Sequence, residues 1–500
     1  MTIAEAAPKD GEQASKKPKV IVIGAGTSGL RAAEVLVQSG CEVVVLEARD
    51  RVGGRIATSS KLGLPLDLGA NWIHGNQGNP IIDLAERAQC SYSVDELDDT
   101  VVYAPDGTLL PKRLGEELVT KMWDYFDDGI EYSARNFSEI KTNVSFVEYY
   151  RSRVEADCLE GQGEKVKEYQ MKVVELLGGI VATDIKRQDL KNLHLEKPIP
   201  GENLFVSSTY GPVMSLMAKT ALENGCVRLN APVEQVETVY TAAGPLHTVC
   251  TKDGETLNAD AVIVTVPLGS LKQDRIKFTP AMPDNIRQSI KHLGYGSLEK
   301  TYISFPTAFW AAESTSYFIF LAPEYAPATN SERKIISAIS LAHLPAPYSQ
   351  PTLLFYTHGD ISKRLTDTLQ WDSPDVSRQN ILAFFQPYFS RLPGYIADDP
   401  ACTPVDILST NWLNDEYAGN GSYTNFPVGL VDGVEDIKTI REGVPGSRLW
   451  LCGEHTAPLL GLASVSGAYW AGEMTARRCL VEFGMMSEDA ERALAMADGL

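Results

Sequence analysis

Three glycines near the start of the chain are spaced as Gly24-x-Gly26-x-x-Gly29, between a run of β-branched residues and a helix-forming segment. This order is typical of a strand, a tight turn and a helix that together bind dinucleotide phosphates. The first glycine permits the turn, the second lets the backbone approach a pyrophosphate, and the third lets the helix pack closely on the strand. The helix N-terminus, at Ser28, adds free N–H groups and a partial positive charge.

A carboxylate follows the second hydrophobic segment of this unit. Residues 42–46 read Glu-Val-Val-Val-Leu and Glu47 comes next, at roughly the 20-residue spacing expected after the glycines. A carboxylate at this point accepts hydrogen bonds from both hydroxyls of a ribose and repels a 2′-phosphate. Glycines and acid together predict a dinucleotide site.

A basic loop follows directly, in which Arg49, Arg51 and Arg55 flank a Gly-Gly pair. Such a loop predicts that the Arg55 guanidinium contacts the cofactor phosphates. The alternative is an ordinary polar connection between two elements. Residues 47–55, followed by Asp-Leu-Gly-Ala-Asn-Trp-Ile-His-Gly at 67–75, resemble the flavin-containing amine oxidase family. This family includes monoamine oxidases, polyamine and spermine oxidases and lysine-specific histone demethylases.

The resemblance covers residues 19–478 and implies that the cofactor is FAD. Within it, Val233 matches a residue whose backbone contacts adenine, Glu454 matches the acid on the ribityl chain, and Ser464-Val465 begin a helix aimed at the flavin. Ser422 stands where monoamine oxidases carry a cysteine joined to the flavin, so non-covalent FAD is expected. The cofactor residues that the resemblance implies are Gly24, Gly26, Ser28, Gly29, Glu47, Ala48, Arg49, Arg55, Ala70, Asn71, Trp72, Val233, Trp412, Gly453, Glu454, Ser464 and Val465.

The resemblance also implies the reacting groups. Lys300 matches a lysine that holds a water against the flavin and assists reoxidation, and is the expected catalytic residue; a strand lysine is otherwise most often a solvated surface charge. Tyr423 matches one wall of an aromatic substrate cage, whose ring face suits an amine. Ser464 replaces the aromatic opposite wall of monoamine oxidases, and His74 resembles the histidine of spermine oxidases, where an imidazole could bind a second nitrogen. Ser466 departs from the family's frequent histidine and weakens the match to polyamine substrates.

The expected fold is α/β, with two domains: a Rossmann-like FAD-binding domain assembled from separated segments and a substrate domain of mixed sheet and helices. Amphipathic periodicity predicts helices such as 164–177, and an apolar run predicts a strand at 259–268. The predicted divisions are a disordered tail at 1–18, the FAD domain at 19–95, 203–280 and 409–480, the substrate domain at 96–202 and 281–408, and a helical tail at 481–500.

Composition and charge limit the kinds of molecule that the protein is expected to bind. A formal charge of −20 disfavours nucleic acid, whose phosphates would be repelled, and suits a cationic substrate. The eight cysteines are scattered singly, so neither a metal site nor a disulfide framework is expected. No signal peptide, uninterrupted apolar run of membrane length or C-terminal targeting signal is found, so a soluble, cytoplasmic protein is expected.

These observations favour an FAD-dependent oxidase of a polyamine or other secondary amine, with O2 reduced to H2O2. A biosynthetic oxidase or oxidocyclase that uses the imine to close a ring in an alkaloid-like product remains open, as does a silent flavoprotein scaffold. An L-amino-acid oxidase is disfavoured, because Gly69-Ala70 is not followed by the Met-Arg pattern that would hold a carboxylate. A chromatin-bound demethylase is also disfavoured, because 18 residues before the first strand leave no room for an added N-terminal domain.

Overall fold

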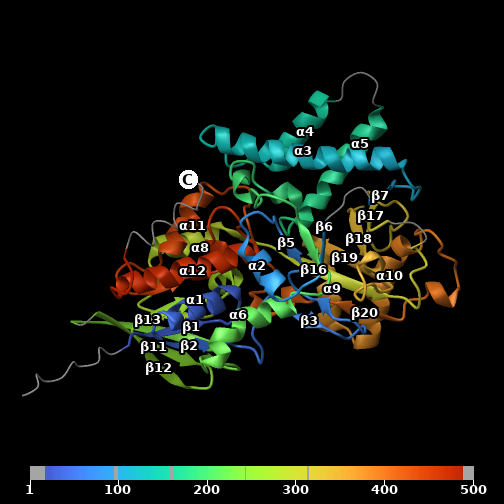
Figure 1. The fold of residues 1–500 in the computed structure, drawn as a ribbon. Coiled ribbons are helices and arrows are strands. Elements are labelled where there is room, and N and C mark those ends of the chain that lie inside the picture. The colour runs from blue at the N-terminus through green and yellow to red at the C-terminus, as the bar shows by residue number, and fades with distance from the viewer. Residues whose placement is uncertain (1–16, 95–99, 158–162, 243, 312–314, 488–500) are drawn as a thin grey trace, which may run out of the picture.

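A computed structural model describes residues 17–94, 100–157, 163–242, 244–311 and 315–487 of the chain (Figure 1). Most of the predicted N-terminal tail therefore lies outside the described residues. The described chain is organised around two sheets, a parallel one near the N-terminus and a mixed one built largely from residues 298–409.

The parallel sheet carries the glycine turn. Its order is β22-β13-β1-β2-β9, and every neighbouring pair is parallel. Because its strands come from stretches far apart in the sequence, the predicted assembly from separated segments is confirmed. The strands are β1 Lys19–Ile23, β2 Glu42–Leu46, β9 Val227–Arg228, β13 Ala261–Val264 and β22 Leu449–Leu451.

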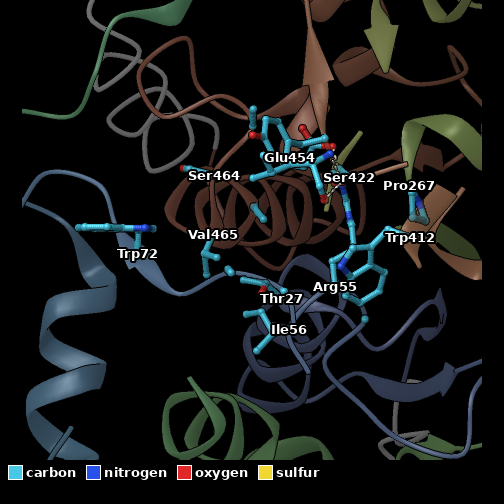
Figure 2. Close-up of a pocket in the computed structure, with 18 of the residues that line it drawn as sticks. Thr27, Arg55, Ile56, Trp72, Pro267, Trp412, Ser422, Glu454, Ser464 and Val465 are labelled. Atoms are coloured by element: carbon cyan, nitrogen blue, oxygen red, sulfur yellow. Dashed lines mark hydrogen bonds and ion pairs between the residues drawn. The ribbon is translucent and has the colours of Figure 1, made fainter. Parts of the chain in front are cut away.

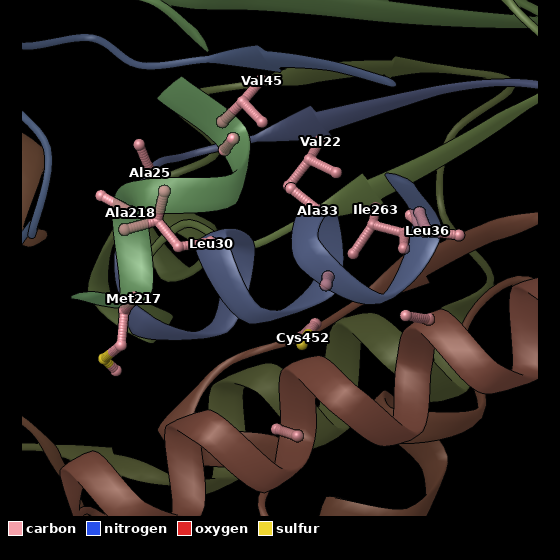
Figure 3. Close-up of a cluster of buried hydrophobic side chains, with 14 of the residues drawn as sticks. Val22, Ala25, Leu30, Ala33, Leu36, Val45, Met217, Ala218, Ile263 and Cys452 are labelled. Atoms are coloured by element: carbon pink, nitrogen blue, oxygen red, sulfur yellow. The ribbon is translucent and has the colours of Figure 1, made fainter. Parts of the chain in front are cut away.

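Both faces of this sheet are covered, as its runs of Val, Ile and Leu require. Val22 and Val45 pack with α1, α6 and α12 on one face (Figure 3). Ile21 and Leu46 alternate with them and pack on the other face against a four-stranded sheet, β12-β11-β10-β14, and helices α8 and α11. The elements are α1 Thr27–Gln38, α6 Gly211–Glu223, α12 Val465–Glu482, β10 Val233–Thr241, β11 Gly244–Thr251, β12 Thr256–Ala259, β14 Lys277–Thr279, α8 Asp284–His292 and α11 Gly433–Glu442.

The second large sheet has six strands in the order β20-β16-β19-β18-β17-β7. One face, including Ile303 and Phe355, packs on α9 and α10. Side chains alternate along a strand, so Lys300 and Tyr356 lie on the opposite face, where they line a cavity. The elements are β7 Thr100–Tyr103, β16 Leu298–Ser304, β17 Tyr317–Phe320, β18 Ile336–Ser340, β19 Thr352–His358, α9 Gly359–Trp371, α10 Pro374–Phe389 and β20 Asp406–Ser409.

A helical layer lies at one end of this sheet (Figure 1). Its long helix α3 buries Leu118, Met122 and Phe126 in a core shared with Ile319 and Ile335 near β17 and β18. The layer contains α3 Lys112–Asn136, α4 Phe146–Asp157 and α5 Glu164–Val173, followed by the 3-10 turns η2 Val174–Gly179, η3 Ile185–Arg187 and η4 Leu193–Glu196.

Shorter elements connect these layers. Strands β5, β8 and β6 form a three-stranded sheet, β3 pairs with β4, and β15 pairs with β21. The remaining α-helices and strands are β3 Thr58–Ser59, β4 Leu66–Asp67, β5 Trp72–Ile73, α2 Pro80–Arg87, β6 Tyr92–Val94, β8 Leu204–Val206, α7 Leu268–Lys272, β15 Gly294–Tyr295 and β21 Thr424–Asn425.

Two predicted elements were wrong in their bounds. The strand predicted at 259–268 ends at Val264, and α7 begins at Leu268, with Pro267 as its N-cap. The helix predicted at 164–177 changes to a 3-10 turn after Val173. Helix α12 ends at Glu482, and most of the predicted helical tail, residues 488–500, lies outside the described residues, so that tail stays a prediction. Helix α9 was not predicted.

The predicted domain boundaries stay predictions. Within the described ranges, no helix is both long enough and apolar enough to cross a bilayer.

Candidate active site

One cavity of about 900 Å³ is lined by residues of both the glycine turn and the six-stranded sheet. Figure 2 shows part of its lining, including Arg55, Trp412 and Glu454. Gly29 is the one predicted site residue that does not line it. The predicted residues that do are Gly24, Gly26, Ser28, Glu47, Ala48, Arg49, Arg55, Ala70, Asn71, Trp72, His74, Val233, Lys300, Trp412, Tyr423, Gly453, Glu454, Ser464 and Val465.

The three glycines differ in what surrounds them. Gly24 has a φ of +107°, and a Cβ added there would lie 2.7 Å from the Thr265 hydroxyl. A Cβ on Gly29 would lie 2.0 Å from the Gly24 carbonyl oxygen, so Gly29 sets the close packing of α1 on β1. A Cβ on Gly26 would meet no atom within 4 Å. The protein therefore leaves the space in front of this turn open, as a bound pyrophosphate requires.

The Glu47 carboxylate is buried at the end of β2, with 6% exposure. One oxygen accepts the N–H of Ala25 at 2.7 Å, and the other accepts the N–H of Arg49 at 2.9 Å. These bonds fix the carboxylate beside the glycine turn. Each oxygen keeps a second lone pair for a hydroxyl donor.

Arg55 joins the first and last cofactor segments. Its Nη1 lies 2.9 Å from a carboxylate oxygen of Glu454 and donates to the Ser422 carbonyl at 2.6 Å (Figure 2). Glu454 is 4% exposed, so this ion pair compensates a buried charge. The predicted contact of Arg55 with phosphates stays a prediction.

Ser464 is the N-cap of α12, and Val465 is its first helical residue. The Ser464 hydroxyl accepts the N–H of Gly467 at 3.0 Å and donates to the Gly461 carbonyl at 2.6 Å. Both bonds are internal to the turn, so the hydroxyl contributes to helix capping and its small size leaves cavity space. The positive end of α12 lies at the cavity wall.

Lys300 is buried on β16 with 3% exposure. Its ammonium donates to the carbonyl oxygens of Asp67 (3.1 Å) and Gly69, and lies 5.7 Å from the centre of the Tyr356 ring. Burial lowers the pKa of Lys300 and the negative charge of Asp67 opposes the effect; burial likewise raises the pKa of Asp67. Because an ammonium has three donors, one remains for a group in the cavity.

Three other cavity residues have side chains that are fixed by hydrogen bonds to backbone groups. Trp412 donates through its indole N–H to the Leu68 carbonyl at 3.1 Å. The Ser422 hydroxyl accepts the N–H of Leu298 at 2.8 Å and donates to the carbonyl of the same residue at 3.0 Å. The Tyr423 hydroxyl donates to the Gly179 carbonyl at 2.6 Å, which ties this predicted cage wall to the helical layer.

Asn71, Trp72 and His74 lie on the segment around β5. The Tyr356 hydroxyl lies 2.9 Å from the Asn71 amide nitrogen and accepts the indole N–H of Trp72 at 3.2 Å. His74 faces the cavity, and its side chain is exposed there.

Ser466, the predicted departure from the family pattern, does not line the cavity. It is 2% exposed, and its hydroxyl donates to the Asn79 side-chain oxygen at 2.8 Å. The Asn79 amide donates to the carbonyls of His74 and Gly75 and its oxygen caps α2. Ser466 thus acts on the His74 loop through Asn79.

Sequence reasoning missed cavity residues that lie outside the family motifs. These include Thr265 beside the glycine turn, Tyr356 and His358 on β19, Trp123 and Asp127 on α3, and Glu196 at the end of η4. The alternation of β19 could have indicated Tyr356. No sequence signal distinguishes Glu196 from a surface acid.

The residues present fit a flavin dinucleotide. The anchored acid at Glu47, the unfilled space at Gly26 and the α12 N-terminus all line one cavity, and they suit the ribose, the pyrophosphate and the flavin that this cofactor joins in that order.

Comparison with known proteins gives the same family. The profile for flavin containing amine oxidoreductases matches residues 27–480. Polyamine oxidase 2 of Arabidopsis thaliana is 28% identical over 490 residues, covering 93% of this chain and 88% of the relative. A corticosteroid-binding protein of Candida albicans is 26% identical over 513 residues, covering 94% and 96%.

A solved structure is also similar. A redesigned double mutant of putrescine oxidase superposes with a TM-score of 0.67 at 20% sequence identity, covering 93% of this chain and 99% of that one. At this identity the likeness shows the shared fold.

Proposed function

The chain belongs to the flavin-containing amine oxidoreductase family and is an FAD-dependent amine oxidase, and we propose that it oxidises a polyamine or another secondary amine. The carbon next to the amine nitrogen loses a hydride to give an imine, and O2 is reduced to H2O2. A cytoplasmic location remains part of the same prediction.

One observation carries this proposal: a single cavity joins the glycine turn to Lys300 and Tyr423. A dinucleotide that begins at Gly24 can therefore reach the space that these two side chains border. That space is where an amine would have to bind.

When bound, the flavin accepts the hydride. The protein's part is to hold the amine and to control protons. Tyr423 offers a ring face to the nitrogen, with its hydroxyl held by Gly179. Lys300, held by the carbonyls of Asp67 and Gly69, has one donor left for a water in the cavity.

The bonds of Ser422 support non-covalent binding. Its hydroxyl is engaged with both backbone groups of Leu298. It also lacks the thiol that would form a thioether. Arg55, Glu454 and Glu47 then hold the cofactor by charge and hydrogen bonds alone.

A second candidate function is a biosynthetic oxidase that acts on a bulkier amine. The observation that favours it is an apolar wall in the cavity, formed by Trp123, Phe126 and Leu176 of the helical layer and Ile335 beside β18. Such a wall would accept a ring system more readily than a chain of ammonium groups.

An anaerobic panel of amines tests the choice. Spermine and N-acetylated polyamines should bleach the oxidised-flavin absorbance faster than benzylamine or phenylethylamine, and peroxide should appear when air is admitted. A faster reaction with the aromatic monoamines would refute the polyamine class. No bleaching by any of these amines would favour the biosynthetic alternative or the silent scaffold.

A further inference from the structure

Five carboxylates line the cavity, and three of them have partners. Glu47 accepts two backbone N–H groups, Glu454 pairs with Arg55, and Glu416 pairs with Arg275 at 3.2 Å. Asp127 is exposed to solvent on α3. The fifth, Glu196, has a different environment.

Glu196 is held by a rigid segment. It ends the 3-10 turn η4, which follows the buried residues Asp189 and Asn192. The Asp189 carboxylate accepts the backbone N–H of Asn192 at 3.0 Å, and the Ser133 hydroxyl of α3 accepts the N–H of His194 at 3.0 Å. These bonds fix the direction in which the Glu196 side chain leaves the turn.

One oxygen of this half-buried carboxylate has no partner in the described chain. Its Oε1 is shielded from solvent and lies within hydrogen-bonding distance of no described donor. No described ion pair includes Glu196, although Lys197 is its neighbour in sequence. Burial raises the pKa of Glu196 to about 8, with no other contribution.

The carboxylate lies near the amine end of the cavity. Glu196 is close enough to Tyr423 for its charge to raise the pKa of that phenol, after the larger effect of burial. Tyr423 borders the space assigned to the reacting amine, and Lys300 lines the same cavity. A substrate held at Tyr423 could therefore extend toward Glu196.

We propose that Glu196 binds a second, non-reacting ammonium group of the substrate, so that the substrate is a di- or polyamine. This inference rests on the proposed function. An ammonium would supply both the hydrogen-bond donor that Oε1 lacks and a charge opposite to that of this half-buried carboxylate. A substrate with one nitrogen and an apolar tail would leave the carboxylate without a partner.

The test uses α,ω-diaminoalkanes of increasing length and n-alkylamines of the same lengths. Equilibrium binding is measured calorimetrically and anaerobically on enzyme whose flavin has been chemically reduced, so that no turnover occurs. Wild-type protein should bind the best diamine about 10- to 100-fold more tightly than the matched monoamine, the range of one charge-assisted hydrogen bond. Glu196→Gln should lose this advantage together with its length optimum.

Glu202→Gln is the matched control, because Glu202 is exposed on the same loop and does not line the cavity. This variant loses the same charge and should keep the diamine advantage. A full advantage in Glu196→Gln, or the absence of any advantage in wild-type protein, would overturn the inference. Diamines that bind through Glu196 but never bleach the oxidised flavin would instead reject the proposed function and leave the binding site standing.

Discussion

Replacing Glu196 by Gln should make the protein more stable at neutral and alkaline pH. An acid whose pKa is raised in the folded state favours unfolding at any pH at which the unfolded chain ionises it. Burial raises the pKa of Glu196 from 4.5 to about 8. Its cost is therefore absent below about pH 4.5, grows as pH rises and levels off above about pH 8.

The size of the effect follows from the same two values. At pH 7 the carboxyl is mostly protonated in the folded protein. In the unfolded chain it is ionised, because pH 7 is 2.5 units above its pKa of 4.5. At about 1.4 kcal/mol for each unit, the cost of Glu196 is about 3 kcal/mol at most. Glutamine has nearly the same shape and does not ionise, so Glu196→Gln should recover much of this free energy.

Thermal unfolding of the flavin-loaded protein, followed from about pH 5 to pH 9, measures the difference. The melting temperature of Glu196→Gln should match that of wild-type protein near pH 5 and exceed it by a few degrees near pH 8. Glu202→Gln should show no such trend. Equal melting temperatures across the whole range would mean that Glu196 already has a partner, and the reasoning would fail together with the proposed ammonium site.

Three other outcomes are expected. Lys300→Met should retain flavin but be reoxidised more slowly by O2, because it loses the ammonium held by two carbonyls; equal stopped-flow rates would remove Lys300 from the reaction. Acid or heat denaturation should release free FAD, since Ser422 offers no thiol, whereas flavin that stays with the precipitated chain would disprove non-covalent binding. Ser466→Ala should lower the free energy of unfolding by about 1 kcal/mol, because the hydrogen bond to Asn79 is lost. It should also raise KM, because Asn79 holds the His74 loop. A lowered melting temperature with an unchanged KM would limit Ser466 to a structural role.

Local chemistry made the cofactor end of the site predictable. The requirements at Gly24, Gly26 and Glu47 concern backbone conformation, open space and a carboxylate at the end of a strand, and sequence spacing encodes all three. The same logic located β16 from Leu298, and Lys300 is on the expected strand. It failed after Val173, where α5 changes to the 3-10 turn η2. Within η2, Gly178 lies so close to β19 that an added Cβ would be 2.2 Å from the His358 ring, and sequence spacing does not show such an approach.

The substrate end was less predictable, because the role of a side chain there depends on which partners tertiary structure provides. Ser466 was interpreted as a departure that weakens the match to polyamine substrates, yet it does not line the cavity, and its hydroxyl is bonded to Asn79. Glu196, by contrast, was not singled out in the sequence but lines the cavity. In sequence it is one acid among many in a chain of charge −20, and in the fold one oxygen of its half-buried carboxylate is shielded from solvent without a donor. A folded chain keeps an unpaired buried acid only at a cost in stability, and a substrate ammonium would offset that cost when it binds. The difference in stability between wild-type protein and Glu196→Gln should therefore shrink as a diamine is added, which links the stability of the free protein to the chemistry of its substrate.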